Sequence, residues 1–137
     1  MPILVDTGVL IAAVDVSDAD HSDAAAVLEL YAGQLFVPAT VVAETSWQLE
    51  NNISVAAEAG FLDAIIVGEL KVIDLLADDY VRAVALIRQY ADLGLGLVDA
   101  SVVAIAERLG ISTIATLDRR DFAVVRPSHV TAFELVP

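Results

Sequence analysis

The sequence contains no cysteine, few basic residues and no long hydrophobic run. Without cysteine, the chain has neither a disulfide framework nor thiolate chemistry. Its longest apolar run extends only from Val9 to Val14, whereas a membrane-spanning helix needs about 20 apolar residues. The hydrophobic content of 58% is therefore expected to form a core and an interface between subunits. No secretory signal is visible at the amino terminus, so we expect a cytoplasmic protein that does not interact with membranes.

Basic residues are scarce: the chain has 7 Lys and Arg against 20 Asp and Glu, a formal net charge of -13. This charge repels nucleic acid at long range and argues against a protein that coats it. It does not exclude a nuclease, because a bound metal ion reverses the sign of the local field. Three of the seven basic residues lie close together in the sequence, at Arg119, Arg120 and Arg126.

Short apolar segments alternate with longer segments of helical periodicity along the whole chain. A length of 137 residues suits a single domain, 1–137, with a substantial core. The alternation predicts a three-layer α/β fold with a mostly parallel central sheet of four to five strands flanked by helices. The expected strands are 2–5, 35–37, 70–73 and 111–115, with 130–135 at the sheet edge, and the expected helices are 7–14, 21–32, 39–50, 54–67, 78–92 and 98–109.

Four acidic residues interrupt or directly follow apolar sequence: Asp6, Glu44, Asp99 and Asp118. Asp6 and Asp118 follow predicted strands, and the carboxyl ends of parallel strands are where α/β proteins bind ligands. Asp99 is predicted to lie in the first turn of a helix, on its inward face. Glu44 shares a helical face with large apolar residues. We expect these side chains to converge at one edge of the sheet.

A cluster of buried carboxylates needs a counter-charge, because an ionised carboxylate without one is costly to bury. The sequence has too few nearby cations to supply four partners. A hard divalent cation, Mg²⁺ or Mn²⁺, is the economical solution. Taken singly, the three aspartates could instead be ordinary helix N-caps, and Glu44 could be a surface residue. The repetition of the pattern at all four positions favours the metal site.

The four acids also stand in sequence contexts that resemble those of PIN-domain ribonucleases, specifically VapC-type toxins of bacterial toxin-antitoxin systems. These contexts are Asp6-Thr7, Val-Val-Ala-Glu ending at Glu44, Val-Asp-Ala-Ser around Asp99, and Thr-Leu-Asp-Arg-Arg-Asp-Phe beginning at Thr116. The resemblance covers essentially the whole chain. No single context is very specific, but the four in this order and at these separations are specific together.

The resemblance implies a metal-dependent endoribonuclease whose acidic pocket consists of Asp6, Glu44, Asp99 and Asp118. In that family the first and third acids are the usual direct Mg²⁺ ligands, which here are Asp6 and Asp99. Asp121 is an alternative to Asp118 as the fourth acid of the pocket.

Hydroxyl and basic side chains beside the acids are further candidates for the site. Thr7 and Thr116 match the family's hydroxyl positions, where they would orient a carboxylate or a metal-bound water, although either could simply cap a helix. Arg119 and Arg120 would meet substrate phosphates, unless they lie in a solvated turn. We assign no role to the two histidines.

The resemblance also implies partners: an RNA substrate, a cognate antitoxin whose carboxyl-terminal segment covers the acidic groove, and a second copy of the chain in a homodimer. The carboxyl-terminal sequence is similar to that of toxins that cut a structured ribosomal RNA loop, whereas tRNA is the common target of the wider group. Two other functions remain to be weighed. One is a receiver-like phosphate-binding domain, which the single acid after the first strand disfavours, and the other is a catalytically silent PIN-like binding protein.

Overall fold

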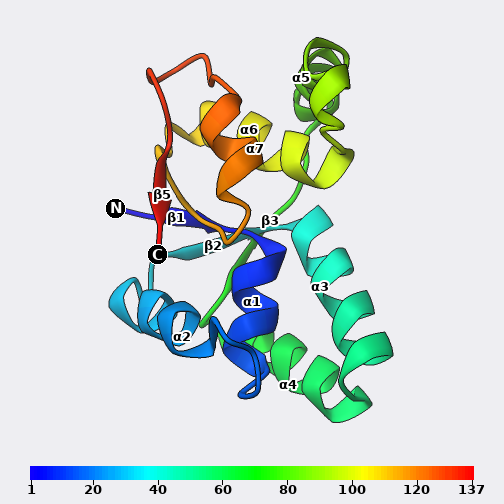
Figure 1. The fold of residues 1–137 in the computed structure, drawn as a ribbon, viewed down its shortest axis with the longest axis vertical. Coiled ribbons are helices and arrows are strands. Elements are labelled where there is room, and N and C mark those ends of the chain that lie inside the picture. Colours follow the sequence, from blue (N-terminus) through cyan, green and yellow to red (C-terminus); the bar gives the residue numbers. More distant parts are fainter.

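A five-stranded sheet with every strand parallel forms the centre of the molecule, which the computed structural model describes over all residues 1–137 (Figure 1). The strand order is β3-β2-β1-β4-β5. Seven α-helices and one 3₁₀-helix connect the strands. The strands are β1 (Ile3–Val5), β2 (Leu35–Pro38), β3 (Lys71–Ile73), β4 (Thr113–Ala115) and β5 (Glu134–Val136).

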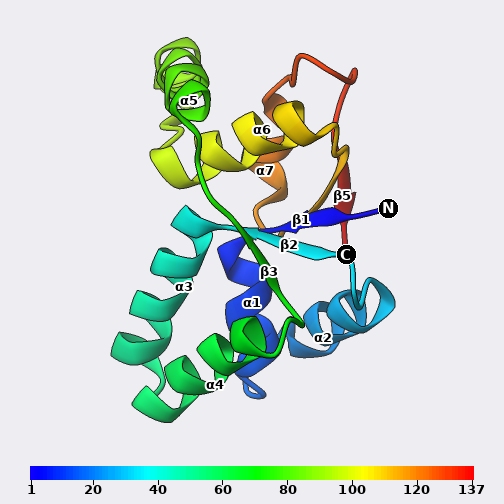
Figure 2. The same cartoon turned by 180° about the vertical axis from the view of Figure 1, so that it is seen from behind.

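Helices cover both faces of this sheet (Figures 1 and 2). The first two, the fourth and most of the third lie on one side, and the last three lie on the other. The fold is therefore the three-layer α/β arrangement that the sequence predicted. The helices are α1 (Thr7–Val14), α2 (His21–Leu30), α3 (Ala39–Asn52), α4 (Val55–Ile66), α5 (Ala77–Gln89), α6 (Leu97–Leu109) and α7 (Arg119–Val124), with the 3₁₀-helix η1 at Ala91–Leu93.

The hydrophobic core includes the central strand β1 and most of helix α6. All three residues of β1 are at most 1% exposed, as expected of a strand covered on both faces. Helix α6 is buried without interruption from Ala100 to Ala106. None of the helices is long and apolar enough to cross a bilayer.

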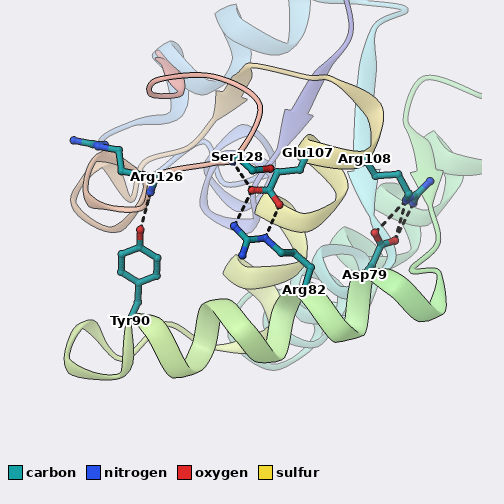
Figure 3. Close-up of polar contacts among 7 residues, drawn as sticks. All are labelled: Asp79, Arg82, Tyr90, Glu107, Arg108, Arg126 and Ser128. Carbon is teal, nitrogen blue, oxygen red and sulfur yellow. Dashed lines mark hydrogen bonds and ion pairs between the residues drawn. The ribbon is translucent and has the colours of Figure 1, made fainter.

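Helix α5 is attached to α6 by two ion pairs, and the segment after α7 is attached to the same layer (Figure 3). Arg82 donates to Glu107 through two nitrogens, at 2.7 and 3.0 Å, and the Ser128 N–H donates to the same carboxylate at 2.7 Å. Arg108 pairs with the buried Asp79, whose carboxylate also accepts the Leu76 N–H at the start of α5. Two of the seven basic residues thus serve the fold.

The carboxyl-terminal quarter differs from the expected elements in two places. Strand β5 spans Glu134–Val136 rather than 130–135, because Phe133 packs edge-on against Phe122 and so anchors a loop before the strand begins. Residues Arg119–Val124 form a short helix, which was not among the helices expected from the sequence. Its apolar content is too small for a periodic signal, and Asp118 starts it by accepting the Asp121 N–H at 3.4 Å.

Candidate metal centre

The strand order reverses direction between β1 and β4, and the four predicted acids gather beside that point. Starting from β1, the chain builds outward through β2 and β3 on one side and through β4 and β5 on the other. Such a switch point leaves a crevice at the carboxyl ends of the two adjacent strands. The receiver-like alternative has a different order, 2-1-3-4-5, and the observed order excludes it.

Strand register sets the position of the first acid. Val5 pairs with Ala115, so the residues that follow, Asp6 and Thr116, emerge side by side. The Asp6 N–H donates to the Ala115 carbonyl at 2.9 Å, and the Thr116 hydroxyl donates to Asp6 Oδ2 at 3.0 Å. Asp6 occupies the N-cap position of α1 but makes no side-chain capping bond. Its buried carboxylate is therefore free of the structural task that N-caps usually perform.

The other acids reach the same crevice from three different elements. Asp99 lies in the first turn of α6, whose N-cap is Gly96, so Asp99 is not a cap either. Glu44 extends from the middle of α3, where Gln48, one turn further on, donates to its Oε1 at 3.3 Å. Asp118 lies in the short connection between β4 and α7 and caps α7, and its own N–H donates to the Thr116 hydroxyl at 2.9 Å.

These four acids line one cavity of about 640 Å³. A fifth acid that sequence reasoning left unassigned, Asp18 of the α1–α2 loop, also lines it. No Lys, Arg or His belongs to the lining, which consists of Asp6, Thr7, Gly8, Ile11, Asp18, Glu44, Gln48, Gly96, Leu97, Val98, Asp99, Leu117 and Asp118. The cavity therefore concentrates negative charge with no protein cation to balance it.

Asp121 lies beside this cavity although it is not among the residues that line it. Carboxylate oxygens of Asp99, Asp118 and Asp121 all lie within 4.8 Å of one another. The sequence left open whether Asp118 or Asp121 completes the pocket. Both lie at the start of the short helix α7, and both come close to Asp99. Burial and then the charge of Asp118 raise the pKa of Asp121.

Burial and mutual repulsion raise the pKa values of two of these acids. Burial, with the neighbouring charges of Asp6, Asp118, Asp121 and Glu44, raises the pKa of Asp99 from 3.8 to about 7. Burial also raises the pKa of Asp6, although the hydroxyl of Thr116 acts in the opposite direction. A divalent cation would oppose both shifts, because its positive charge stabilises the ionised carboxylates.

The donor set fits such a cation. Several carboxylates around one small volume, with room left for water, are the ligands that Mg²⁺ and Mn²⁺ prefer. Thr7 adds a second indication, because its buried Oγ1 has no hydrogen-bond partner although the residue lines the cavity. A buried hydroxyl without a partner is rare in native proteins and points to a bound water or ligand. Of the predicted hydroxyls, Thr116 orients a carboxylate and Thr7 is left available.

The predicted basic residues do not join the lining of the cavity. The guanidinium of Arg119 donates to the Pro137 carbonyl at 2.6 Å, which directs it toward the carboxyl-terminal residue. Arg120 is exposed, and its charge acts on Asp121. Each histidine contacts a backbone carbonyl, His21 that of Ala12 and His129 that of Ile111.

Comparison with known proteins gives consistent results. The sequence model of the PIN domain matches residues 3–126. The chain is 30% identical over 135 residues to Ribonuclease VapC26 of Mycobacterium tuberculosis, covering 98% of this chain and 100% of the relative.

Solved structures share the fold. One is M. tuberculosis VapC20, described as a sarcin-ricin loop cleaving toxin, with a TM-score of 0.83 and 22% identity over 94% of this chain and 98% of that one. Another is a toxin-antitoxin complex from Klebsiella pneumoniae, with a TM-score of 0.70 and 26% identity over 96% of this chain and 98% of that one.

The raised pKa of Asp99 predicts how stability depends on pH in the absence of metal. Its folded-state pKa of about 7 exceeds the ordinary 3.8, so the folded protein binds this proton more tightly than the unfolded chain does. The free energy of unfolding should therefore fall as the pH rises from about 4 through about 7. Urea unfolding in EDTA over this range should show the fall in the natural protein and a shallower one in Asp99→Asn.

The exposed Asp63 of α4 provides the control, because Asp63→Asn makes the same charge change away from the cavity. This variant should keep the natural pH dependence. Excess Mg²⁺ should offset the fall at high pH, because it binds the ionised form. Identical pH dependence in Asp99→Asn and Asp63→Asn would show that the crowding of carboxylates has no energetic consequence.

Proposed function

The chain belongs to the VapC family of PIN-domain ribonuclease toxins, and from that premise we propose that it is a Mg²⁺-dependent endoribonuclease that hydrolyses phosphodiester bonds in structured RNA. One observation carries the proposal: five acids and no protein cation line a single cavity at the switch point of the sheet. Such a site has little structural purpose without a dication. Mn²⁺ has similar ligand preferences and is expected to substitute.

Phosphodiester hydrolysis needs an activated water, stabilisation of charge on the phosphoryl oxygens and a stabilised leaving group. Bound Mg²⁺ supplies these by lowering the pKa of water and by neutralising the developing charge. We assign its direct binding to Asp6 and Asp99, the two acids with raised pKa values that line the cavity. Glu44 and Asp118 complete the set, either as ligands or by accepting a hydrogen bond from the attacking water.

The two threonines have distinct roles in this proposal. Thr116 holds the Asp6 carboxylate in one orientation through its 3.0 Å hydrogen bond, as groups behind metal ligands commonly do. Thr7 lines the cavity, and its buried hydroxyl, which has no protein partner, would bind a water of the site. Asp121, within 4.8 Å of Asp99 and Asp118, raises the negative potential and with it the affinity for the cation.

Contact with RNA must overcome a net charge of -13. We propose that Arg119, Arg120 and Arg126 bind phosphates at the side of the site formed by α7 and the segment after it. All three are exposed, in contrast to Arg82 and Arg108, which are partly buried in ion pairs. A ribosomal RNA loop is one substrate class, because a structural neighbour is described as a sarcin-ricin loop cleaving toxin. tRNA is the alternative that the sequence resemblance implies.

Single substitutions test the metal site directly. Asp6→Asn or Asp99→Asn should lower Mg²⁺-dependent cleavage of a structured RNA at least about 100-fold, because each removes a charged ligand without changing size. Cleavage should be followed on gels with tRNA and with a ribosomal RNA loop fragment, in Mg²⁺, in Mn²⁺ and in EDTA. Asp63→Asn, with the same charge change at an exposed position of α4, should retain activity.

Two results would count against the enzyme. Cleavage that persists in EDTA, or in Asp6→Asn at the natural rate, would exclude the proposed metal mechanism. No cleavage of any RNA by a folded protein that binds Mn²⁺ would favour the remaining alternative, a catalytically silent PIN-like binding protein.

We propose two protein partners, a cognate antitoxin and a second copy of the chain. Solved relatives of this fold include toxin-antitoxin complexes, which supports the first. An antitoxin with a basic side chain, such as Arg, at its carboxyl-terminal segment would supply the cation that the cavity lacks. The proposed setting is cytoplasmic, where both RNA and antitoxin are found.

The proposed dimer uses the exposed apolar face of α5. Leu76, Tyr80 and Val84 follow one another at four-residue spacing on this helix and its N-cap, and with Val81 they are between 44% and 70% exposed. Residues at that spacing share one helical face. Such a row of large apolar side chains on a protein of this charge is typical of a subunit interface.

Light scattering tests this assembly. The purified chain should have the mass of two copies, and Val81→Glu should reduce it to one. Val67→Glu, at the comparably exposed end of α4 (68% against 70%), should remain dimeric. Co-expression with the product of an adjacent small reading frame should yield a complex that no longer cleaves RNA. A monomeric natural chain, or dimers in both variants, would refute the α5 interface.

A further inference from the structure

Two hydroxyl groups join the helices that carry Glu44 and Asp99. Thr40, at the start of α3, and Ser101, in α6, have their Oγ atoms 2.6 Å apart. Ser101 is fully buried, at 0% exposure. Its Oγ also lies 2.7 Å from the carbonyl oxygen of Val98. No other hydrogen bond connects α3 to α6.

The direction of these bonds follows from their chemistry. The Val98 carbonyl can only accept, so the Ser101 hydroxyl donates its proton there. The Ser101 oxygen is then left as an acceptor, and the Thr40 hydroxyl donates to it. The two hydrogen bonds therefore run in one direction only, from Thr40 in α3 through Ser101 to the Val98 carbonyl in the first turn of α6.

Both ends of this chain lie next to metal-site acids. Thr40 precedes Glu44 by four residues, and residues at this spacing are neighbours on a helix. On the other helix, Val98 and Ser101 flank Asp99 in the sequence. Glu44 and Asp99 line the same cavity from these two helices. A shift of α3 along α6 would change the separation of the two carboxylates directly.

We propose that Thr40 and Ser101 are positioning residues that fix Glu44 relative to Asp99 and thereby set the affinity of the cavity for a divalent cation. Neither hydroxyl lines the cavity, so both act through the acids. The inference rests on the proposed metal-dependent function. Groups hydrogen-bonded directly to metal ligands typically change metal affinity about 10–100-fold when they are removed. We expect the lower end of that range here, because this pair acts through the helices that carry the acids.

The test is a direct titration of the purified chain with Mn²⁺, followed by calorimetry and by the loss of free Mn²⁺ signal in electron paramagnetic resonance. Thr40→Val keeps the volume but removes the donor, and it should weaken Mn²⁺ binding roughly tenfold. Thr40→Ser restores the hydroxyl and should bind nearly as the natural chain does. Ser101→Ala should match Thr40→Val, and the double variant should be no worse than either alone, because both remove the same interaction.

Thr45 offers a matched control on the same helix. It is adjacent to Glu44 and fully buried, and its Oγ1 has no hydrogen-bond partner. Thr45→Val makes the same chemical change as Thr40→Val without breaking a contact between helices. It should leave Mn²⁺ affinity unchanged. Urea unfolding of every variant separates a loss of folding from a loss of affinity.

Natural Mn²⁺ affinity in a folded Thr40→Val variant would overturn the positioning role and leave the pair as ordinary helix packing. A loss in Thr40→Val that Thr40→Ser does not recover would overturn it as well. The failure of the proposed function is distinguishable: if the natural chain binds no Mn²⁺, or if Asp6→Asn binds it equally well, the metal site itself is wrong. If the natural chain binds and Asp6→Asn does not, the result with Thr40→Val decides the positioning role alone.

Discussion

Repulsion among carboxylates crowded into one cavity is the constraint on which the functional part of this molecule depends. Asp6 and Asp118 follow adjacent parallel strands, and Asp99 and Glu44 project from helices on either side of the crevice. Burial and mutual charge hold the pKa of Asp99 near 7, in a protein that places no basic side chain against the cavity. Such an arrangement is costly unless a cation is bound, which is why we propose a divalent cation there.

Strand register, a buried helix and ion pairs hold these acids close together. The register of β1 against β4 places Asp6 beside Thr116, so the hydrogen bond between them follows from backbone pairing. Helix α6 is buried from Ala100 to Ala106, which fixes the position of Asp99 just before that stretch. The ion pairs of Arg82 and Arg108 hold α5 against α6. Rigid elements supply the acids, as precise metal sites require.

The parts that the sequence predicted correctly are those with a strong local signal. Apolar runs that lead to a carboxylate identified β1 and β4, and helical periodicity placed Asp99 on the inward face of α6. The short helix α7 has too few apolar residues to show periodicity. The sequence therefore left open whether Asp118 or Asp121 is the fourth acid of the pocket, and did not show that both lie near Asp99. The start of β5 depends on the packing of Phe133 against Phe122, a contact that local pattern does not encode.

Other features depend on the tertiary structure alone. Thr40 and Ser101 are 61 residues apart in the sequence, and nothing in either local pattern pairs them. Asp18 belongs to a loop with several acids, and only the folded chain shows that this one faces the cavity. Arg119 lies next to Asp118 in sequence, yet its guanidinium contacts the Pro137 carbonyl. Adjacency in the chain was a poor guide to which side chains meet.

The most direct test of the account is a crystal of the protein grown with Mn²⁺ and measured at the absorption edge of manganese. The account predicts an anomalous peak inside the cavity, coordinated by carboxylate oxygens of Asp6 and Asp99. Full occupancy elsewhere on this acidic surface, with no peak between those two residues at saturating Mn²⁺, would contradict it.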